Sequence, residues 1–164
     1  MPRLAIITTH PIQYNAPWFA LLAQKPGIEV KVFYTWSQRQ TEFFDDNFGK
    51  EIQWDIPLLE GYDYAFVTNT SKKPGNKSFR GIKCPTLIPQ IKEFAPTHLL
   101  VFGWNFQAHF KAMRHFKGKI PVLFRGDSTL LDYEIQTLSD LVKEPLSKLF
   151  RHGSGQLLKF KLRK

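Results

Sequence analysis

Cysteine is nearly absent from this sequence of 164 residues, because Cys84 is its only thiol. A single thiol excludes an intrachain disulfide and any zinc site built from several cysteines. The sequence also lacks a run of about 20 apolar residues, the length that a membrane-spanning helix requires, and the apolar stretch near its start is too short for a signal peptide. We therefore expect a cytoplasmic protein in which Cys84 is a small buried or loop residue and not a nucleophile.

Phosphate-binding and metal-binding signatures are missing as well. No GxGxxG, GKS or GKT sequence occurs, which argues against the glycine-rich cradles of dinucleotide-binding and P-loop proteins. Four histidines lack metal-ligand spacing with any Cys, Asp or Glu, and we expect them at the surface or at helix caps: His98, His109, His115 and His152. The sequence therefore predicts neither a metal nor another cofactor.

Acidic residues are outnumbered, since 14 Asp and Glu stand against 23 Lys and Arg and give a net charge of +9. Residues 143–164 hold seven of the cations and one Glu, which leaves +6 on that segment and +3 on the other 142 residues. A charge of +3 is too small for a surface that follows nucleic-acid phosphates, and no nucleic-acid motif is present, so we expect no nucleic-acid partner. Residues 151–164 form a basic tail that interleaves cations with Leu and Phe. One interpretation places this tail on an anionic bilayer, peripherally at the inner face of the membrane, and the alternative is a solvated end.

Apolar runs rich in Val, Ile, Leu and Phe alternate with helical patterns along the chain. The runs predict buried strands at 4–8, 29–36, 98–104 and 121–126. The helical patterns predict helices that begin near Asn15, Thr86, Asn105 and Tyr133. Strand, helix and strand in this order force a right-handed parallel crossover. The sequence thus predicts an α/β fold, a Rossmann-like three-layer domain with a mainly parallel sheet over residues 1–150, followed by the basic tail.

Local patterns add detail to this prediction. In the first helix Trp18, Leu21 and Leu22 share one face, and in the helix near Asn105 a stripe is expected to face the core: Phe106, Phe110, Met113 and Phe116. The segments QWDIPLL and YDYAFV predict a hairpin or two irregular strands. Residues 68–81 predict a mobile loop, because their polar side chains bury too little apolar surface to offset the entropy of ordering.

Three loops follow predicted strands and hold most of the groups that could contact a ligand. In an open parallel sheet ligands bind at the carboxyl ends of the strands. The candidates are His10, Gln13, Tyr14 and Asn15 in the first loop, Gly103, Trp104 and Asn105 in the second, and Arg125, Asp127 and Ser128 in the third. Structural alternatives remain open: Asn15 and Asn105 can cap helices, and Arg125 and Asp127 can pair with each other to pin their loop.

In this order, LAIITTHPIQYNAPWFALLA, LLVFGWN and IPVLFRGDSTLLD resemble a known family. They are similar to the amino-terminal domain of the retaining GT-B glycosyltransferases of family 4, in the branch whose first loop reads His-Pro-x-Gln-Tyr and whose last reads Arg-Gly-Asp-Ser. The resemblance covers about residues 3 to 150. It implies transfer of a sugar from a nucleotide-sugar donor to a glycan or lipid-linked acceptor. In that family the amino-terminal domain holds the acceptor, and no metal is needed.

The resemblance implies catalytic roles for His10, Arg125 and Asp127, and substrate binding by the other loop residues. Arg125 departs from the pattern, because many relatives have a histidine there, and an arginine could instead stabilise negative charge on the leaving diphosphate. The donor-binding domain has no counterpart in this sequence. We therefore expect activity only with a carboxy-terminal donor domain, in cis in a longer parent or in trans. The alternative is a non-catalytic binding module that retains the acceptor cleft or docks on a membrane or protein partner.

Overall fold

The computed structural model of the chain describes residues 1–36, 43–45, 50–52 and 57–125. Some predictions lie outside these residues: the helix beginning near Tyr133, the basic tail, the place of His152, and the positions of Asp127 and Ser128.

The fold is built on a five-stranded sheet in which every strand pair is parallel. Its order is β5-β2-β1-β6-β7. The strands are β1 (Arg3–Thr8), β2 (Glu29–Tyr34), β5 (Asp63–Phe66), β6 (His98–Phe102) and β7 (Val122–Arg125). A separate antiparallel pair joins β3 (Phe43–Asp45) to β4 (Lys50–Ile52). The predicted α/β fold with a parallel sheet is confirmed.

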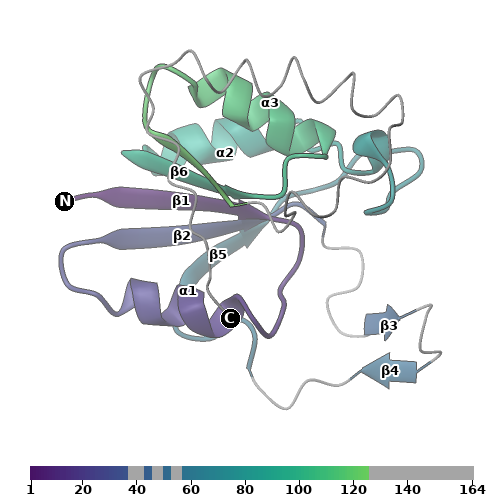
Figure 1. Ribbon diagram of the computed structural model, residues 1–164, viewed down its shortest axis with the longest axis horizontal. Helices are drawn as coiled ribbons and strands as arrows, with labels where there is room; N and C mark the ends of the chain where they lie inside the picture. The colour runs from purple at the N-terminus through teal and green to yellow at the C-terminus, as the bar shows by residue number, and fades with distance from the viewer. Residues whose placement is uncertain (37–42, 46–49, 53–56, 126–164) are drawn as a thin grey trace, which may run out of the picture.

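Helices cover both faces of the sheet (Figure 1). Helix α1 (Ala16–Ala23) lies on one face, and α2 (Leu87–Phe94) and α3 (Gln107–Phe116) lie on the other. Successive side chains of β1 alternate between the two cores: Leu4 and Ile6 pack with α1 residues, whereas Ala5 and Ile7 pack with α2 and α3 residues. This alternation explains why the first strand reads as continuously apolar.

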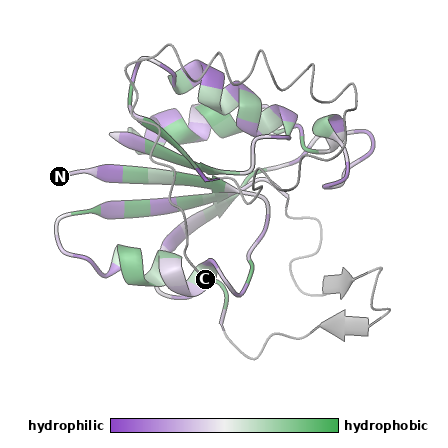
Figure 2. Cartoon of the chain, viewed as in Figure 1, coloured by the Kyte–Doolittle hydropathy of each residue, from purple (hydrophilic) through white to green (hydrophobic). Residues whose placement is uncertain are grey.

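The face of α1 that packs on the sheet differs from the predicted one. Phe19 and Ala16 are buried, whereas Trp18 is 38% and Leu21 59% exposed. The helix reads APWFALLA and has no charged residue on any side; Figure 2 colours part of it green and part of it nearly white. Such a helix has no single apolar stripe, so the sheet selects its face. Phe19 is selected because its ring meets the edges of Tyr62 and Phe102, with centroids 5.7 and 5.6 Å away.

The segment YDYAFV contains a strand, whereas residues 53–56 of QWDIPLL lie outside the described residues. The central residues of YDYAFV form β5, which pairs in parallel with β2, and Leu58 and Leu59 lie in a turn. Four residues are too few to show a clear alternation of apolar and polar side chains, so the sequence did not reveal that this strand joins the parallel sheet.

Residues 68–81, predicted as a mobile loop, are organised around the side chain of Asn69. Its Oδ1 accepts hydrogen bonds from the backbone N–H groups of Ser71 and Lys83, at 3.0 and 2.9 Å. Its Nδ2 donates to the carbonyl of Gly81 at 2.8 Å. The loop ends in a short 3-10 helix, η1 (Phe79–Gly81). Polar side chains therefore order this loop by hydrogen bonding instead of by apolar burial.

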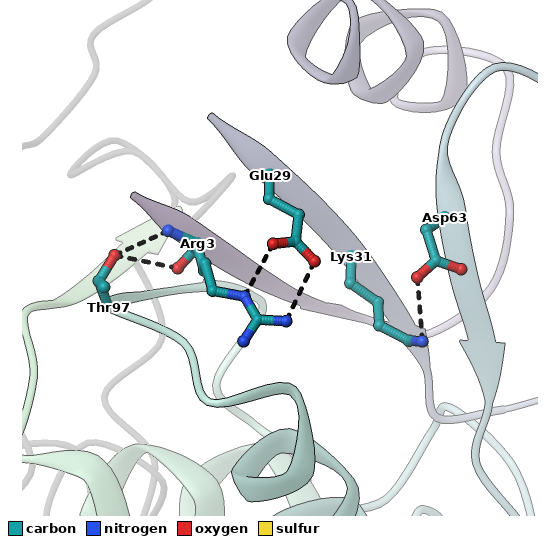
Figure 3. Close-up of polar contacts among 5 residues, drawn as sticks. All are labelled: Arg3, Glu29, Lys31, Asp63 and Thr97. Atoms are coloured by element: carbon teal, nitrogen blue, oxygen red, sulfur yellow. Dashed lines mark hydrogen bonds and ion pairs between the residues drawn. The ribbon is translucent and has the colours of Figure 1, made fainter. Parts of the chain in front are cut away.

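The amino edge of the sheet is closed by charged pairs (Figure 3). Arg3 contacts the Glu29 carboxylate through two nitrogens, at 2.8 and 3.0 Å, and Lys31 pairs with Asp63 at 3.0 Å. The backbone N–H of Arg3 also donates to the Thr97 hydroxyl at 2.9 Å. These cations and carboxylates neutralise one another, so the fold alone accounts for the charged residues at this edge.

No helix in the part of the chain that the structure describes is both long and apolar enough to cross a bilayer.

Candidate functional site

The strand registers bring the predicted loops to one edge of the sheet. Strands β1, β6 and β7 are adjacent and parallel, with Ile7 beside Val101 and Phe102 beside Arg125. The loops that follow these strands must therefore start at the same carboxyl edge. We call the described candidates the carboxyl rim; its members are His10, Gln13, Tyr14, Asn15, Gly103, Trp104, Asn105 and Arg125.

Arg125 connects all three loops of the carboxyl rim. Its Nη1 donates to Oδ1 of Asn15 at 3.3 Å, and its guanidinium carbon lies 5.1 Å from the ring centroid of Phe102. Its carbonyl accepts a hydrogen bond from the N–H of Gly103 at 3.2 Å. A cation held by an amide and an aromatic face is positioned at the sheet edge, where it can meet an anionic ligand.

Asn15 does not cap α1 with its side chain, although it occupies the N-cap position. The side chain is buried and directed to Arg125. The structural alternative for Asn15 therefore fails, and a contact between residues 110 positions apart in the sequence takes its place.

His10 is half-buried and packs its ring against Trp36, with centroids 5.5 Å apart and the planes nearly perpendicular. Its Nδ1 lies 3.0 Å from the hydroxyl of Thr9. Burial lowers the pKa of His10 below its usual value of 6.5, which favours the neutral imidazole at pH 7.

Trp36 is a neighbour of the carboxyl rim that the sequence did not single out. Trp36 follows β2, and its backbone N–H donates to the carbonyl of Thr9 at 2.8 Å. The strand predicted for EVKVFYTW included Trp36, whereas β2 ends at Tyr34. A bulky aromatic residue two positions past a strand end is the signal that could have identified it.

The remaining members of the carboxyl rim differ in exposure. Tyr14 is 79% exposed, Gln13 and Trp104 are half-buried, and Asn105 is exposed. Asn105 does not cap α3, because Phe106 occupies that position. Gly103 adopts a φ of +72°, a left-handed conformation that glycine takes readily. The rim thus presents aromatic rings and amides around a chain reversal that needs glycine.

His109 was predicted at the surface or at a cap, and this is wrong. It is fully buried beneath the carboxyl rim, where Nε2 lies 2.7 Å from the Thr35 hydroxyl and Nδ1 lies 2.9 Å from the carbonyl of Gly103. The carbonyl of Gly103 can only accept, so Nδ1 carries the proton and donates to it. The Thr35 hydroxyl has a single proton, for which Nε2 of His109 and the carbonyl of Thr8, 3.1 Å away, both compete. Burial lowers the pKa of His109 to about 4. The signal was its place three residues after Phe106 on the apolar stripe.

The stripe itself is confirmed, since Phe106, Met113 and Phe116 are buried and Phe110 is half-buried. Cys84 is also buried, and its Sγ donates to the carbonyl of Thr35 at 3.3 Å. Burial raises the pKa of its thiol to about 12, so Cys84 is a packing residue, as predicted.

The described part of the carboxyl rim offers hydroxyl, amide, imidazole and aromatic groups with one guanidinium, but no carboxylate. These groups can hydrogen-bond a polyhydroxylated ligand, stack on its apolar face and neutralise one negative charge. Among the residues that the structure describes, no three His, Cys, Asp or Glu side chains are grouped to hold a metal ion.

No protein-family model matches this sequence, and no curated protein matches it either.

Proposed function

We propose that this chain is the amino-terminal, acceptor-side domain of a retaining glycosyltransferase of the GT-B type. It transfers a sugar from a nucleotide-sugar donor to a glycan or lipid-linked acceptor, together with a carboxy-terminal donor domain. One observation carries the proposal: the HPIQYN loop and the strand-end Arg125, which belong to two of the resembling motifs, meet through the contact between Asn15 and Arg125. The parallel sheet, with its ligand-binding edge formed by those loops, supports the same assignment.

The proposed role of Arg125 follows from its charge and place. The leaving nucleoside diphosphate gains negative charge as the bond to the sugar breaks, and a guanidinium forms short charge-assisted hydrogen bonds to phosphate oxygens. Asn15 and Phe102 hold the cation in place, so little conformational entropy is lost when the phosphate arrives.

The proposed role of the neutral His10 is to hydrogen-bond the acceptor or donor sugar near the reacting centre. Tyr14 and Trp104 present aromatic surface on which the apolar face of a sugar ring can pack. Asp127 and Ser128, which lie outside the described residues, keep their predicted places in the site by resemblance alone. The carboxyl rim binds one partner in the reaction, and the donor domain must supply the remaining binding energy.

A non-catalytic binding module is the second candidate. It is favoured by the amide, aromatic and guanidinium groups of the described rim, which can bind a ligand without reacting with it.

A turnover screen distinguishes the two candidates. Release of nucleoside diphosphate is measured from a panel of UDP-, GDP- and ADP-sugars, with the chain alone and mixed with a donor-binding domain encoded beside it. We expect turnover only in the mixture, reduced by Arg125→Ala and unchanged by Lys25→Ala, which changes an exposed cation in the turn between α1 and the amino end of β2. Turnover by the chain alone would overturn the half-enzyme proposal. Acceptor binding without turnover in any mixture would favour the binding module.

A further inference from the structure

The positive charge of the body is concentrated on one part of the fold. Residues 68–125 contain eleven Lys and Arg and one acidic residue, Glu93, which gives a net charge of +10. Residues 1–67 contain five Lys and Arg and eight Asp and Glu, which gives −3. The net charge of +3 on residues 1–142 therefore conceals a separation between an acidic and a basic part of the chain. The basic segment includes α2, α3 and η1, and α2 and α3 form the helical layer opposite α1 (Figure 1).

A shallow groove of about 490 Å³ lies within this basic layer, between η1, α2 and α3. Its apolar lining is Phe79, Ile88 and Phe110, and its polar lining is Gln107, Lys111, Arg114 and His115. The ring of Phe79 meets that of Phe110 at a centroid distance of 6.1 Å, yet Phe79 remains 44% exposed. An aromatic side chain is thus presented to solvent among cations.

The cations around the groove have few acidic partners. Arg114 lies over the ring of Phe110 at 5.8 Å, and Lys119 approaches the His115 ring at 3.3 Å. Both ion pairs among the described residues lie at the amino edge of the sheet, between Arg3 and Glu29 and between Lys31 and Asp63, and neither includes a groove residue. Positive potential therefore extends over the groove and attracts an anionic surface.

We propose that a basic face of the protein binds an anionic lipid surface. This face consists of the groove residues and of the exposed lysines that precede and follow η1, which are Lys72, Lys73, Lys77 and Lys83. Lys111 and Arg114 contact lipid phosphates, while Phe79 enters the boundary between headgroups and acyl chains. A lipid surface is the favoured occupant because the exposed Phe79 adds an apolar side chain that can enter the headgroup boundary beside the cations. Binding of nucleic acid is made an outcome of the test. The inference stands independently of the proposed transferase function, and it differs from an attachment through the basic tail.

The two parts of the interaction give separable effects. Each cation near an anionic surface contributes enough that its removal weakens partition about fivefold, so Lys111→Gln with Arg114→Gln should lower it about 25-fold. Phe79→Ser removes the inserted ring and should weaken partition at every salt concentration. Phe79→Trp keeps an aromatic ring and should preserve binding.

The test is co-sedimentation of the full chain with phosphatidylcholine vesicles, with and without phosphatidylglycerol. Lys25→Gln and Leu21→Ser are matched controls, since both residues are exposed in or beside α1 on the opposite layer. We expect pelleting only with the anionic vesicles, lost in the double variant and in Phe79→Ser, and retained in both controls. Circular dichroism verifies that each variant is folded.

Three results would overturn the proposal. The first is equal pelleting of the wild type and the double variant. The second is loss of binding only when Lys159, Lys161, Arg163 and Lys164 are changed to Gln in the full chain, which would assign the contact to the tail. The third is salt-sensitive binding of duplex DNA that the double variant loses while vesicle pelleting is unchanged.

Discussion

The buried imidazole of His109 makes the stability of the fold depend on pH. Burial lowers its pKa from 6.5 to about 4 in the native state, so between these values the unfolded chain binds a proton that the folded chain does not. The contribution of the neutral His109 to the unfolding free energy is fully present above pH 6.5. It is lost as the pH falls towards 4, at about 1.4 kcal/mol per pH unit. The unfolding free energy, measured by urea unfolding at several pH values, should change less with pH for His109→Gln than for the wild type. His98→Gln, at a partly exposed site, is the control, and equal slopes for wild type and His109→Gln would contradict this account.

The thiol of Cys84 should be unreactive in the folded protein. Only the thiolate reacts, and a pKa raised from 9.0 to about 12 lowers its population about a thousandfold at pH 8. Labelling with a thiol-specific disulfide reagent should therefore be very slow in the native protein and fast in denaturant. Rapid native labelling would mean that the hydrogen bond from Cys84 to Thr35 opens readily.

At the scale of elements, the loop between β5 and α2 has one position where a methyl group cannot be added. A Cβ on Gly81 would lie 2.1 Å from the carbonyl oxygen of Gly75, whose N–H donates to Gly81 at 3.2 Å. Gly81→Ala must displace backbone and break this hydrogen bond, so we expect a loss of about 1–3 kcal/mol in unfolding free energy. Gly75→Ala is the matched control within the same loop, since nothing lies within 4 Å of its Cβ position. A thermal or urea melt with equal shifts for the two variants would show that the loop simply relaxes.

The elements differ in how far the sequence determined them. The strands β1, β2, β6 and β7 were predictable because each is a short segment rich in Val, Ile, Leu, Phe or Tyr. The packing face of α1 was not, because an apolar helix leaves that choice to the sheet, which selects Phe19. Two of the three hydrogen bonds of Asn69 could not be predicted either, since they join it to backbone groups more than ten residues away. At the carboxyl rim, the parallel topology predicted which loops share an edge, whereas the burial of His109 and the direction of the Asn15 side chain depend on packing between distant segments.

At the scale of the whole molecule, the two edges of the sheet carry their arginines for different reasons. At the amino edge, Arg3 binds Glu29 and lies 4.5 Å from the Phe94 ring. At the carboxyl edge, Arg125 is held by Asn15 and Phe102. If the proposed function holds, we expect the amino edge to contribute to stability and the carboxyl edge to bind the ligand.

The same substitution made at the two edges tests this division. Arg3→Gln removes a partly exposed ion pair and should lower the unfolding free energy by about 1 kcal/mol or less, while turnover with a donor domain stays unchanged. Arg125→Gln keeps a hydrogen-bond donor but loses the charge, so it should reduce turnover about a hundredfold if the guanidinium stabilises the leaving diphosphate. Urea unfolding and nucleoside diphosphate release, measured on both variants, give the comparison. Equal effects of the two variants on turnover would mean that Arg125 only fastens the loops of the carboxyl rim, and the leaving-group role would then have to be assigned to another residue.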